Sequence, residues 1–335
     1  KTGTSTYDQV CFGDGEYPTL SSYTDTASNE IIGTVWLNDK VVFFSRYDGT
    51  WSDPCSLITY SGSDSMFYTP PCLAIDDSGT AHLSWGIITK HHTSPDSATY
   101  QVRYSTFNAG LDTPSVIEND TLEEGRMSIT GWSNNTILSS IDLMNDTLPA
   151  ITWSRTLGAS KDTVFFMQMS GDTWPDDPDT ISSSSDDCRS PFLLFSSTSP
   201  HIVWDEDAEM IKYRTKTIFG WGPIETVGGG IFTPSRNPQL IYDDSLSCVF
   251  TEKNQVIPNH RSNVVYRVRK GTNNWSSSRI IQSSNVLSEY AHSCIKSTRL
   301  RKSSSTGARY GSTRIPSEQE HMALSGTNHQ EILIL

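Results

Sequence analysis

Two arginines stand at matching places along the chain, and their side chains suit the binding of an anion. Arg189-Ser190-Pro191 and Arg236-Asn237-Pro238 each precede an apolar run that is expected to form a strand. A guanidinium presents a rigid fork that holds a carboxylate through two hydrogen bonds. We therefore predict an anion site at Arg189 and Arg236. The alternative is that each arginine pairs with a nearby acidic residue at the rim of the fold.

Tyrosines and a glutamate occupy the same slot before other expected strands. Tyr17 and Tyr68 stand there in two early segments, and Glu289 with Tyr290 stands there in a late one. Adjacent residues on a strand point to opposite faces, so a working Tyr–Glu couple would combine different segments. The alternative is an aromatic rim that packs or binds sugar.

A long loop after Trp85 carries His91, His92 and Asp96. A histidine can act as a general base near neutral pH, because its ordinary pKa lies close to 7. We therefore name His92 as a candidate catalytic group and His91 as a candidate ligand contact. A solvated loop is the alternative.

Acidic runs give no convincing metal site. Asp205-Glu206-Asp207 and Asp176-Asp177 supply carboxylates that calcium prefers, but neither matches a full calcium loop with spaced ligands and a glycine. Solvated turns account for both runs. We predict no metal, and no cofactor, because no nucleotide-binding or other cofactor motif stands in a suitable context.

Internal similarity organises the chain into copies of a unit of about 54 residues. Each copy has four short runs rich in β-forming residues, separated by turn residues. One copy contains His82-Leu83-Ser84-Trp85 and Val102-Arg103-Tyr104-Ser105, and another contains His201-Ile202-Val203-Trp204 and Ile211-Lys212-Tyr213-Arg214. A single four-stranded sheet cannot bury both faces, so neighbouring sheets must stack. Radial stacking predicts a β-propeller, with the recurring tryptophans packed between blades.

The copies also set the number of blades and the domain limits. Five copies begin near residues 18, 70, 138, 190 and 237, and a sixth is expected near Ser288. We predict an all-β propeller of four-stranded antiparallel blades. Six blades are expected, five clear and one degenerate, with five or seven as alternatives. Residues 1–295 form this domain, and residues 296–335 form a divergent last blade or a poorly ordered basic tail.

Composition narrows the partners and the compartment. The formal net charge of −13 argues against nucleic acid, which needs clustered Lys and Arg. No apolar stretch is long enough to cross a bilayer, so we expect no membrane insertion. Sequons at Asn119, Asn134, Asn145 and Asn274 are compatible with a secreted glycoprotein. We expect an extracellular or cell-surface location.

Six cysteines permit disulfide bonds but contain no CxxC pair that would indicate zinc. Cys55 and Cys72 flank one expected loop, so they are the first candidate pair. Buried thiols are the alternative.

One turn carries a resemblance to a known family. Ser45-Arg46-Tyr47-Asp48-Gly49-Thr50-Trp51 resembles a degenerate Asp-box, the turn motif of the sialidase-like (BNR-repeat) propellers, and fragments recur at Ser170–Trp174 and Gly271–Trp275. The resemblance covers about residues 16–295. This superfamily includes sialidases, polysaccharide lyases, lectins and non-catalytic surface proteins, so it bears more on fold than on function.

The resemblance also implies roles for some residues. Sialidases of this superfamily place an arginine just before the first inner strand and use a Tyr nucleophile with a carboxylate. This chain departs from that pattern, because Tyr17-Pro18 stands where the arginine belongs, and Arg314-Ile315-Pro316 lies in the unpatterned tail. Tyr290, Glu289 and His92 are the catalytic candidates. Carbohydrate, including acidic glycans, is the expected partner; a glycan-processing enzyme (sialidase-like or lyase) and a structural or adhesive module are the alternatives.

Overall fold

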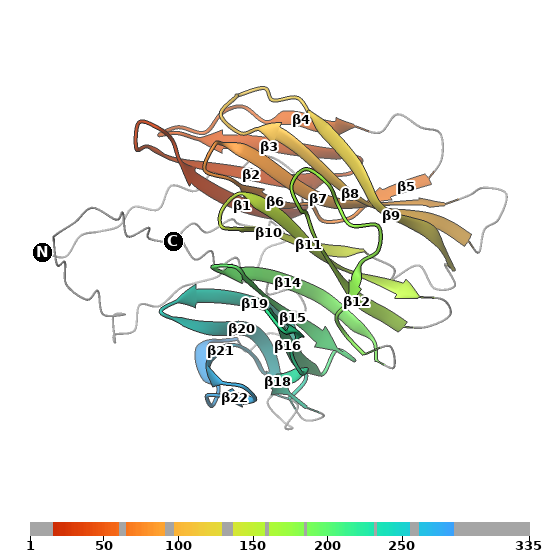
Figure 1. The fold of residues 1–335 in the computed structure, drawn as a ribbon, viewed down its shortest axis with the longest axis vertical. Coiled ribbons are helices and arrows are strands. Elements are labelled where there is room, and N and C mark those ends of the chain that lie inside the picture. Colours follow the sequence, from red (N-terminus) through yellow and green to blue (C-terminus); the bar gives the residue numbers. More distant parts are fainter. Residues whose placement is uncertain are drawn as a thin grey trace, which may run out of the picture.

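The computed structural model describes residues 16–59, 65–90, 97–128, 137–157, 161–183, 186–230, 233–254 and 261–284. These residues form β-strands and turns without a helix, arranged as five antiparallel sheets (Figure 1). No helix that is long and apolar enough to cross a membrane occurs in this part of the chain.

The five sheets follow the chain in order, and we call them blades 1 to 5. Blade 1 holds β1 (Glu16–Thr24), β2 (Glu30–Asn38), β3 (Val41–Tyr47) and β4 (Cys55–Thr59). Blade 2 holds β5 (Ser65–Tyr68), β6 (Cys72–Ile75), β7 (Thr80–Lys90), β8 (Ser97–Asn108) and β9 (Glu118–Ser128). Blade 3 holds β10 (Leu138–Met144), β11 (Leu148–Leu157), β12 (Lys161–Gln168) and β13 (Asp179–Thr180).

Blades 4 and 5 follow the same plan with an additional short strand each. Blade 4 holds β14 (Cys188–Ser196), β15 (Ser199–Glu206), β16 (Met210–Thr217), β17 (Gly220–Trp221) and β18 (Glu225–Gly229). Blade 5 holds β19 (Ser235–Asp243), β20 (Ser245–Asn254), β21 (Arg261–Gly271), β22 (Asn274–Trp275) and β23 (Arg279–Ser284).

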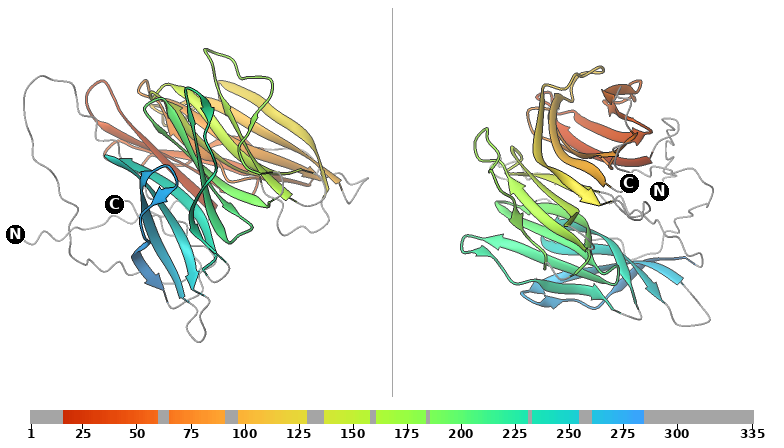
Figure 2. Two further views of the ribbon diagram at one scale, coloured as in Figure 1. Left: turned by 60° about the horizontal axis from the view of Figure 1, so that its bottom comes forward. Right: turned by 90° about the vertical axis from the view of Figure 1, so that its right-hand side faces the viewer.

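The blades succeed one another as a fan (Figure 2). Their inner strands lie side by side: the Ser21 hydroxyl of β1 accepts the N–H of Ile75 in β6 at 2.9 Å. The Ser140 hydroxyl of β10 accepts the N–H of Leu193 in β14 at 3.1 Å. Radial blades whose first strands meet near one axis define a β-propeller, so the predicted fold class is confirmed. Five blades lie within the described residues; the expected sixth blade and the limit at residue 295 fall outside them.

Four apolar clusters hold the blades together, one at each interface between successive blades. The tryptophan of the second strand belongs to these clusters, as Trp85, Trp153 and Trp204 show. Each is almost fully buried. Burying a large aromatic side chain between two sheets is strongly stabilising, which accounts for the recurrence of tryptophan in the sequence. The predicted packing of these tryptophans between blades is confirmed.

Two of these interfaces also contain a polar contact, which we call the blade clamp, in which a carboxylate of one blade binds a tryptophan N–H and a cation of the next. Between blades 3 and 4, the Asp179 carboxylate accepts hydrogen bonds of 2.9 Å from both Trp221 Nε1 and Lys216 Nζ. Between blades 4 and 5, Glu225 accepts bonds from Trp275 Nε1 at 3.0 Å and Arg269 at 2.7 Å.

The two clamps have the same geometry. In each, the acid pairs across the sheet with an aromatic residue of the third strand, Phe166 or Tyr213. The tryptophan and the cation of the next blade both pack on that aromatic ring. A clamp therefore consists of an acid from one blade and a turn tryptophan and a cation from the next.

The expected Cys55–Cys72 disulfide is wrong. Cys55 begins the outer strand of blade 1, and its Sγ lies 3.9 Å from the Pro114 carbonyl. Cys72 begins an inner strand of blade 2, and its Sγ donates to the Ser139 carbonyl at 2.9 Å. A disulfide needs Cβ atoms about 4 Å apart, and these cysteines stand at opposite radii of the wheel. Both residues keep a thiol.

Candidate functional site

Three inner strands begin with the same backbone distortion. Near the start of β1, β14 and β19, a β-bulge shifts the register of pairing with the second strand of the blade. In each bulge a residue with positive φ precedes a proline; these residues are Tyr17 (56°), Ser190 (49°) and Asn237 (54°). Proline has no N–H for the ladder and is confined to such irregular positions in sheets. A left-handed conformation costs a non-glycine residue about 1–2 kcal/mol, and repeated local strain of this kind marks candidate functional sites.

The bulges align the predicted arginines. Arg189 and Arg236 each stand immediately before the left-handed residue, in neighbouring blades 4 and 5. In blade 1 the same alignment places Glu16 in the arginine position and Tyr17 in the left-handed position. The structure therefore brings the two arginines to one end of the propeller, where the inner strands begin, and gives blade 1 no arginine there.

Arg189 is held by carboxylates. Its Nε donates to Asp162 at 2.6 Å, and its terminal nitrogen lies 3.0 Å from Asp187. Partial burial lowers the pKa of Arg189, but the two carboxylates outweigh that effect, so the pKa lies above its usual value. The pairing with rim acids, which was the alternative to an anion site, is thus present at Arg189. Its side chain nonetheless remains 36% exposed.

Arg236 is exposed and differs from Arg189 in its partners. Its Nε approaches the Ala208 carbonyl at 3.5 Å, the outer limit of a hydrogen bond. Among the described residues, no carboxylate lies within ion-pair distance of Arg236. Its guanidinium therefore presents donors to solvent.

A buried acid lies close enough to feel the charges of both arginines. Asp205, in β15, is the ladder partner of Arg189 and is only 4% exposed. It accepts hydrogen bonds from the Ser190 hydroxyl and the Asn237 N–H, and it feels the charges of Arg236 and Arg189. Burial raises the pKa of Asp205 from its ordinary value in spite of these partners. The strained residues of two bulges thus hold one carboxyl group.

Sequence reasoning missed this role for Asp205 and treated its acidic run only as a calcium candidate. A signal was present: the residue after the second-strand aromatic is an acid in blade 4 alone. Its counterparts in the other blades are Leu37, Gly86, Ser154 and Thr251. Among the described residues, no group of three or more suitable side chains is placed to hold a metal ion.

The remaining predicted residues are placed only in part. Tyr68 ends β5 opposite Ile87, and nothing is described of its side chain. His91, His92, Glu289 and Tyr290 lie outside the described residues. Their roles stay predictions.

Comparisons with known proteins concern the fold. No family model matches the sequence, and no curated protein does. A protein of unknown function from Dyadobacter fermentans is similar, with 10% identity, a TM-score of 0.50 and coverage of 75% of this chain and 78% of that one.

Two further solved structures have propeller folds. The fucose-specific lectin from Aleuria aurantia has 8% identity and a TM-score of 0.46, with 79% of each chain covered. An ulvan lyase has 10% identity and a TM-score of 0.48, with 82% of this chain and 87% of that one covered. At these identities and TM-scores, neither structure bears on the substrate of this chain.

Proposed function

We propose that this chain is an extracellular or cell-surface propeller that binds carbohydrate, acidic glycans in particular, at the end where its inner strands begin. The observation that carries the proposal is that Arg189 and Arg236 stand at matching bulges of neighbouring blades 4 and 5, where the buried carboxyl group of Asp205 feels both of their charges. Arg236 is the primary anchor, because its guanidinium is exposed and unpaired by any described carboxylate.

The chemistry of the three groups suits an acidic sugar. Guanidinium donors hold a carboxylate or sulfate in two-point contact. The Asp205 carboxyl group is buried and accepts hydrogen bonds from Ser190 and Asn237, so the exposed guanidinium of Arg236 is the group that faces an incoming anion, although the chain as a whole is acidic. Tyr17, Tyr68 and His91 are proposed as further contacts around the same end.

A second candidate function follows from the raised pKa of Asp205. Burial raises the pKa of this carboxyl group, and a raised carboxyl pKa is the property that general acids in glycan cleavage share. In this version of the proposal the chain is a glycan-processing enzyme, with Tyr290, Glu289 and His92 as the other catalytic candidates.

The test is a glycan-binding screen beside turnover assays with a fluorogenic sialoside and with uronic-acid polymers. Arg236→Ala is expected to weaken binding roughly tenfold or more, since a charge-assisted hydrogen bond contributes about 1.5–3 kcal/mol. Arg279→Ala is the matched control, because Arg279 is an exposed arginine on the outer strand of blade 5. Equal affinity in both variants would refute the site.

The same screen separates the candidate functions. Turnover that Asp205→Asn abolishes while binding persists would establish the enzyme. Binding without turnover in the unaltered chain would establish the lectin-like function. A chain that binds no glycan in the screen would be a structural or adhesive module, which contradicts the proposal.

A further inference from the structure

One interface of the propeller replaces every part of the blade clamp. In blade 1, Phe44 occupies the place of Phe166 and Tyr213, and its ladder partner is Cys55 instead of an acid. Phe107 of blade 2 packs on Phe44 in the place of the cation. Five residues later, where Trp221 follows Lys216, stands Asp112.

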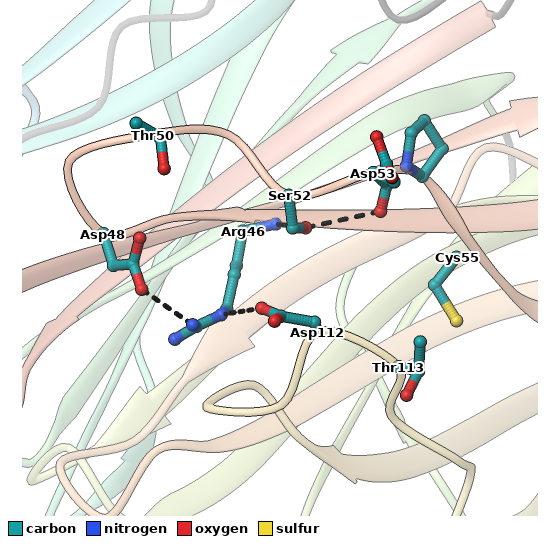
Figure 3. Close-up of a pocket in the computed structure, with 9 residues that line it drawn as sticks. Arg46, Asp48, Thr50, Ser52, Asp53, Cys55, Asp112 and Thr113 are labelled. Atoms are coloured by element: carbon teal, nitrogen blue, oxygen red, sulfur yellow. Dashed lines mark hydrogen bonds and ion pairs between the residues drawn. The ribbon is translucent and has the colours of Figure 1, made fainter.

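The missing tryptophan leaves a cavity of about 570 Å³ between the outer parts of blades 1 and 2 (Figure 3). Its lining combines Arg46, Asp48 and Ser52 of the blade 1 turn, Cys55 of β4 and Asp112 of blade 2. Ligand pockets commonly have volumes of roughly 300–1,000 Å³. The turn is the one that resembles an Asp-box, a motif to which the axial site gives no role.

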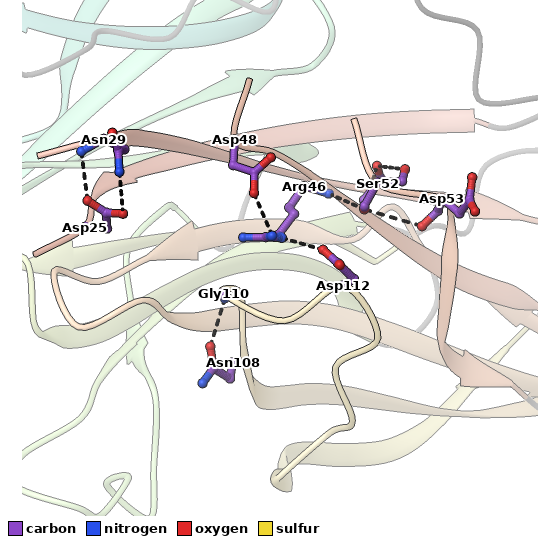
Figure 4. A network of polar contacts seen from close by, with 10 residues as sticks. Asp25, Asn29, Arg46, Asp48, Ser52, Asp53, Asn108, Gly110 and Asp112 are labelled. Atoms are coloured by element: carbon purple, nitrogen blue, oxygen red, sulfur yellow. Dashed lines mark hydrogen bonds and ion pairs between the residues drawn. The ribbon is translucent and has the colours of Figure 1, made fainter. Parts of the chain in front are cut away.

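Arg46 spans this cavity. Its Nε donates to Asp112 at 2.7 Å, and its other terminus donates to Asp48 at 2.7 Å (Figure 4). The Ser52 hydroxyl accepts the Arg46 N–H at 3.1 Å and thereby holds the turn. Because Asp112 is 66% exposed, the carboxylate reaches the solvent side of the cavity while it is still bound to Arg46.

The charges of the lining select the chemistry of a ligand. The lining holds three carboxylates, those of Asp48, Asp53 and Asp112, and one guanidinium, so it repels anions. Carboxylate acceptors alternate with guanidinium donors over a few ångströms. Vicinal hydroxyl groups match that alternation, because each hydroxyl donates to one partner and accepts from the next.

The interface also breaks the rule that its neighbours follow. Each of the other described outer turns carries a tryptophan: Trp51, Trp174, Trp221 and Trp275. Local departures from a pattern that otherwise favours stability mark functional sites. We propose that the cavity between blades 1 and 2 binds a neutral sugar residue through its vicinal hydroxyl groups, at a site separate from the axial arginines.

Cys55 provides a readout that is local to the cavity. The probes are methyl α-mannoside, methyl β-galactoside and methyl α-fucoside, each titrated against the full chain during alkylation of its thiols. Peptide mass spectrometry follows Cys55 separately from the other cysteines. At least one glycoside is expected to slow Cys55 alkylation several-fold in a saturable manner, and glucuronate is expected to have no effect.

Two variants test the geometry. Asp112→Asn preserves volume but removes the acceptor charge, and we expect it to weaken protection at least several-fold. Asp112→Trp combined with Cys55→Asp rebuilds the clamp tryptophan and acid, fills the cavity and is expected to abolish glycoside binding measured by calorimetry. Because the second variant changes the thiol, calorimetry replaces alkylation there, and thermal unfolding checks that it is folded.

The outcomes are separable from those for the axial site. Arg236→Ala should leave Cys55 protection unchanged even if it abolishes glycan binding at the axial end. Failure of all three glycosides to protect Cys55, protection that persists in Asp112→Asn, or protection by glucuronate would each overturn the proposal.

Discussion

The interfaces between blades 4 and 5 and between blades 1 and 2 share one backbone register but have opposite characters. In the first, Glu225 is 2% exposed and binds Arg269 at 2.7 Å. In the second, Asp112 is 66% exposed and binds Arg46 at the same distance of 2.7 Å. The difference shows that three side chains, the acid, the cation and the turn tryptophan, decide whether this place in the fold holds a buried blade clamp or an open polar cavity.

The interface between blades 2 and 3 is intermediate and makes the same point. It retains the turn tryptophan, Trp174, which packs edge-on against Tyr104. Met169 stands in the place of the cation. The indole N–H of Trp174 is buried without an acceptor among the described residues. A different acid, Glu123, joins these blades by accepting from Trp153 Nε1 at 2.8 Å.

The largest expected effect on stability comes from removing the acid of the blade clamp between blades 4 and 5. Glu225→Ala leaves the guanidinium of Arg269 and the indole N–H of Trp275 in a buried site without their acceptor. Removal of one partner of a buried ion pair typically costs about 3–5 kcal/mol. We expect a loss of this size in the free energy of unfolding measured by urea titration.

Glu225→Gln is the companion variant. It keeps the volume and one hydrogen-bond acceptor but loses the charge, and we expect a smaller loss than with alanine. Equal stability of Glu225→Ala and the unaltered chain would show that the clamp does not hold blades 4 and 5 together.

A second effect lies just behind the same clamp. His201 is buried, with Nδ1 at 2.6 Å from the Tyr213 hydroxyl and Nε2 at 2.6 Å from Ser196 Oγ. Burial lowers the pKa of His201 to about 4; the charge of Arg269 adds to the effect, and Glu225 opposes it. The folded state therefore holds this imidazole neutral at pH values where the unfolded chain protonates it.

The sign of the pH dependence follows directly. Between the ordinary histidine pKa of about 6.5 and the folded value of about 4, the unfolded state binds more protons, so stability falls as the pH falls. The full loss is roughly 3 kcal/mol, at about 1.4 kcal/mol for each unit of pKa. Urea titrations at pH 7, 5.5 and 4 measure it. His201→Gln, which cannot titrate, should flatten this part of the profile, and an unchanged profile would contradict the assignment.

Much of the fold was predictable because the residues that repeat along the sequence are the ones that the fold buries between its blades. Trp85, Trp153 and Trp204 mark second strands, and the turn tryptophans mark outer turns, so the blade pattern was visible before any coordinates. The error on Cys55 and Cys72 has a physical cause. The connection between two blades runs from the outer strand of one to the inner strand of the next, so its two ends lie at different distances from the propeller axis. Separation along the sequence does not reveal that difference.

The candidate site was predictable only in part. The Arg189 and Arg236 pair followed from the shared pattern of arginine, one residue and proline. The part played by Asp205 depends on burial and on bulges that turn Ser190 and Asn237 toward it, and neither is a property of local sequence. The cavity at Asp112 depends on a contact between two blades, which the sequence does not report. The sequence does show that blade 2 lacks the outer-turn tryptophan of the other described blades.

The smallest expected effect completes the comparison of the two interfaces. Asp112→Ala removes the partner of Arg46 at an exposed site, where water and Asp48 continue to solvate the guanidinium. Exposed ion pairs typically contribute about 0–1 kcal/mol, so we expect a loss below about 1 kcal/mol in the free energy of unfolding. Added salt should shrink that loss further, because exposed charges are screened over about 10 Å at 0.1 M salt.

A loss comparable to that of Glu225→Ala would mean that the Arg46–Asp112 pair itself holds blades 1 and 2 together. The open cavity would then be a structural joint between blades, without the freedom to exchange its internal hydrogen bonds for those of a ligand.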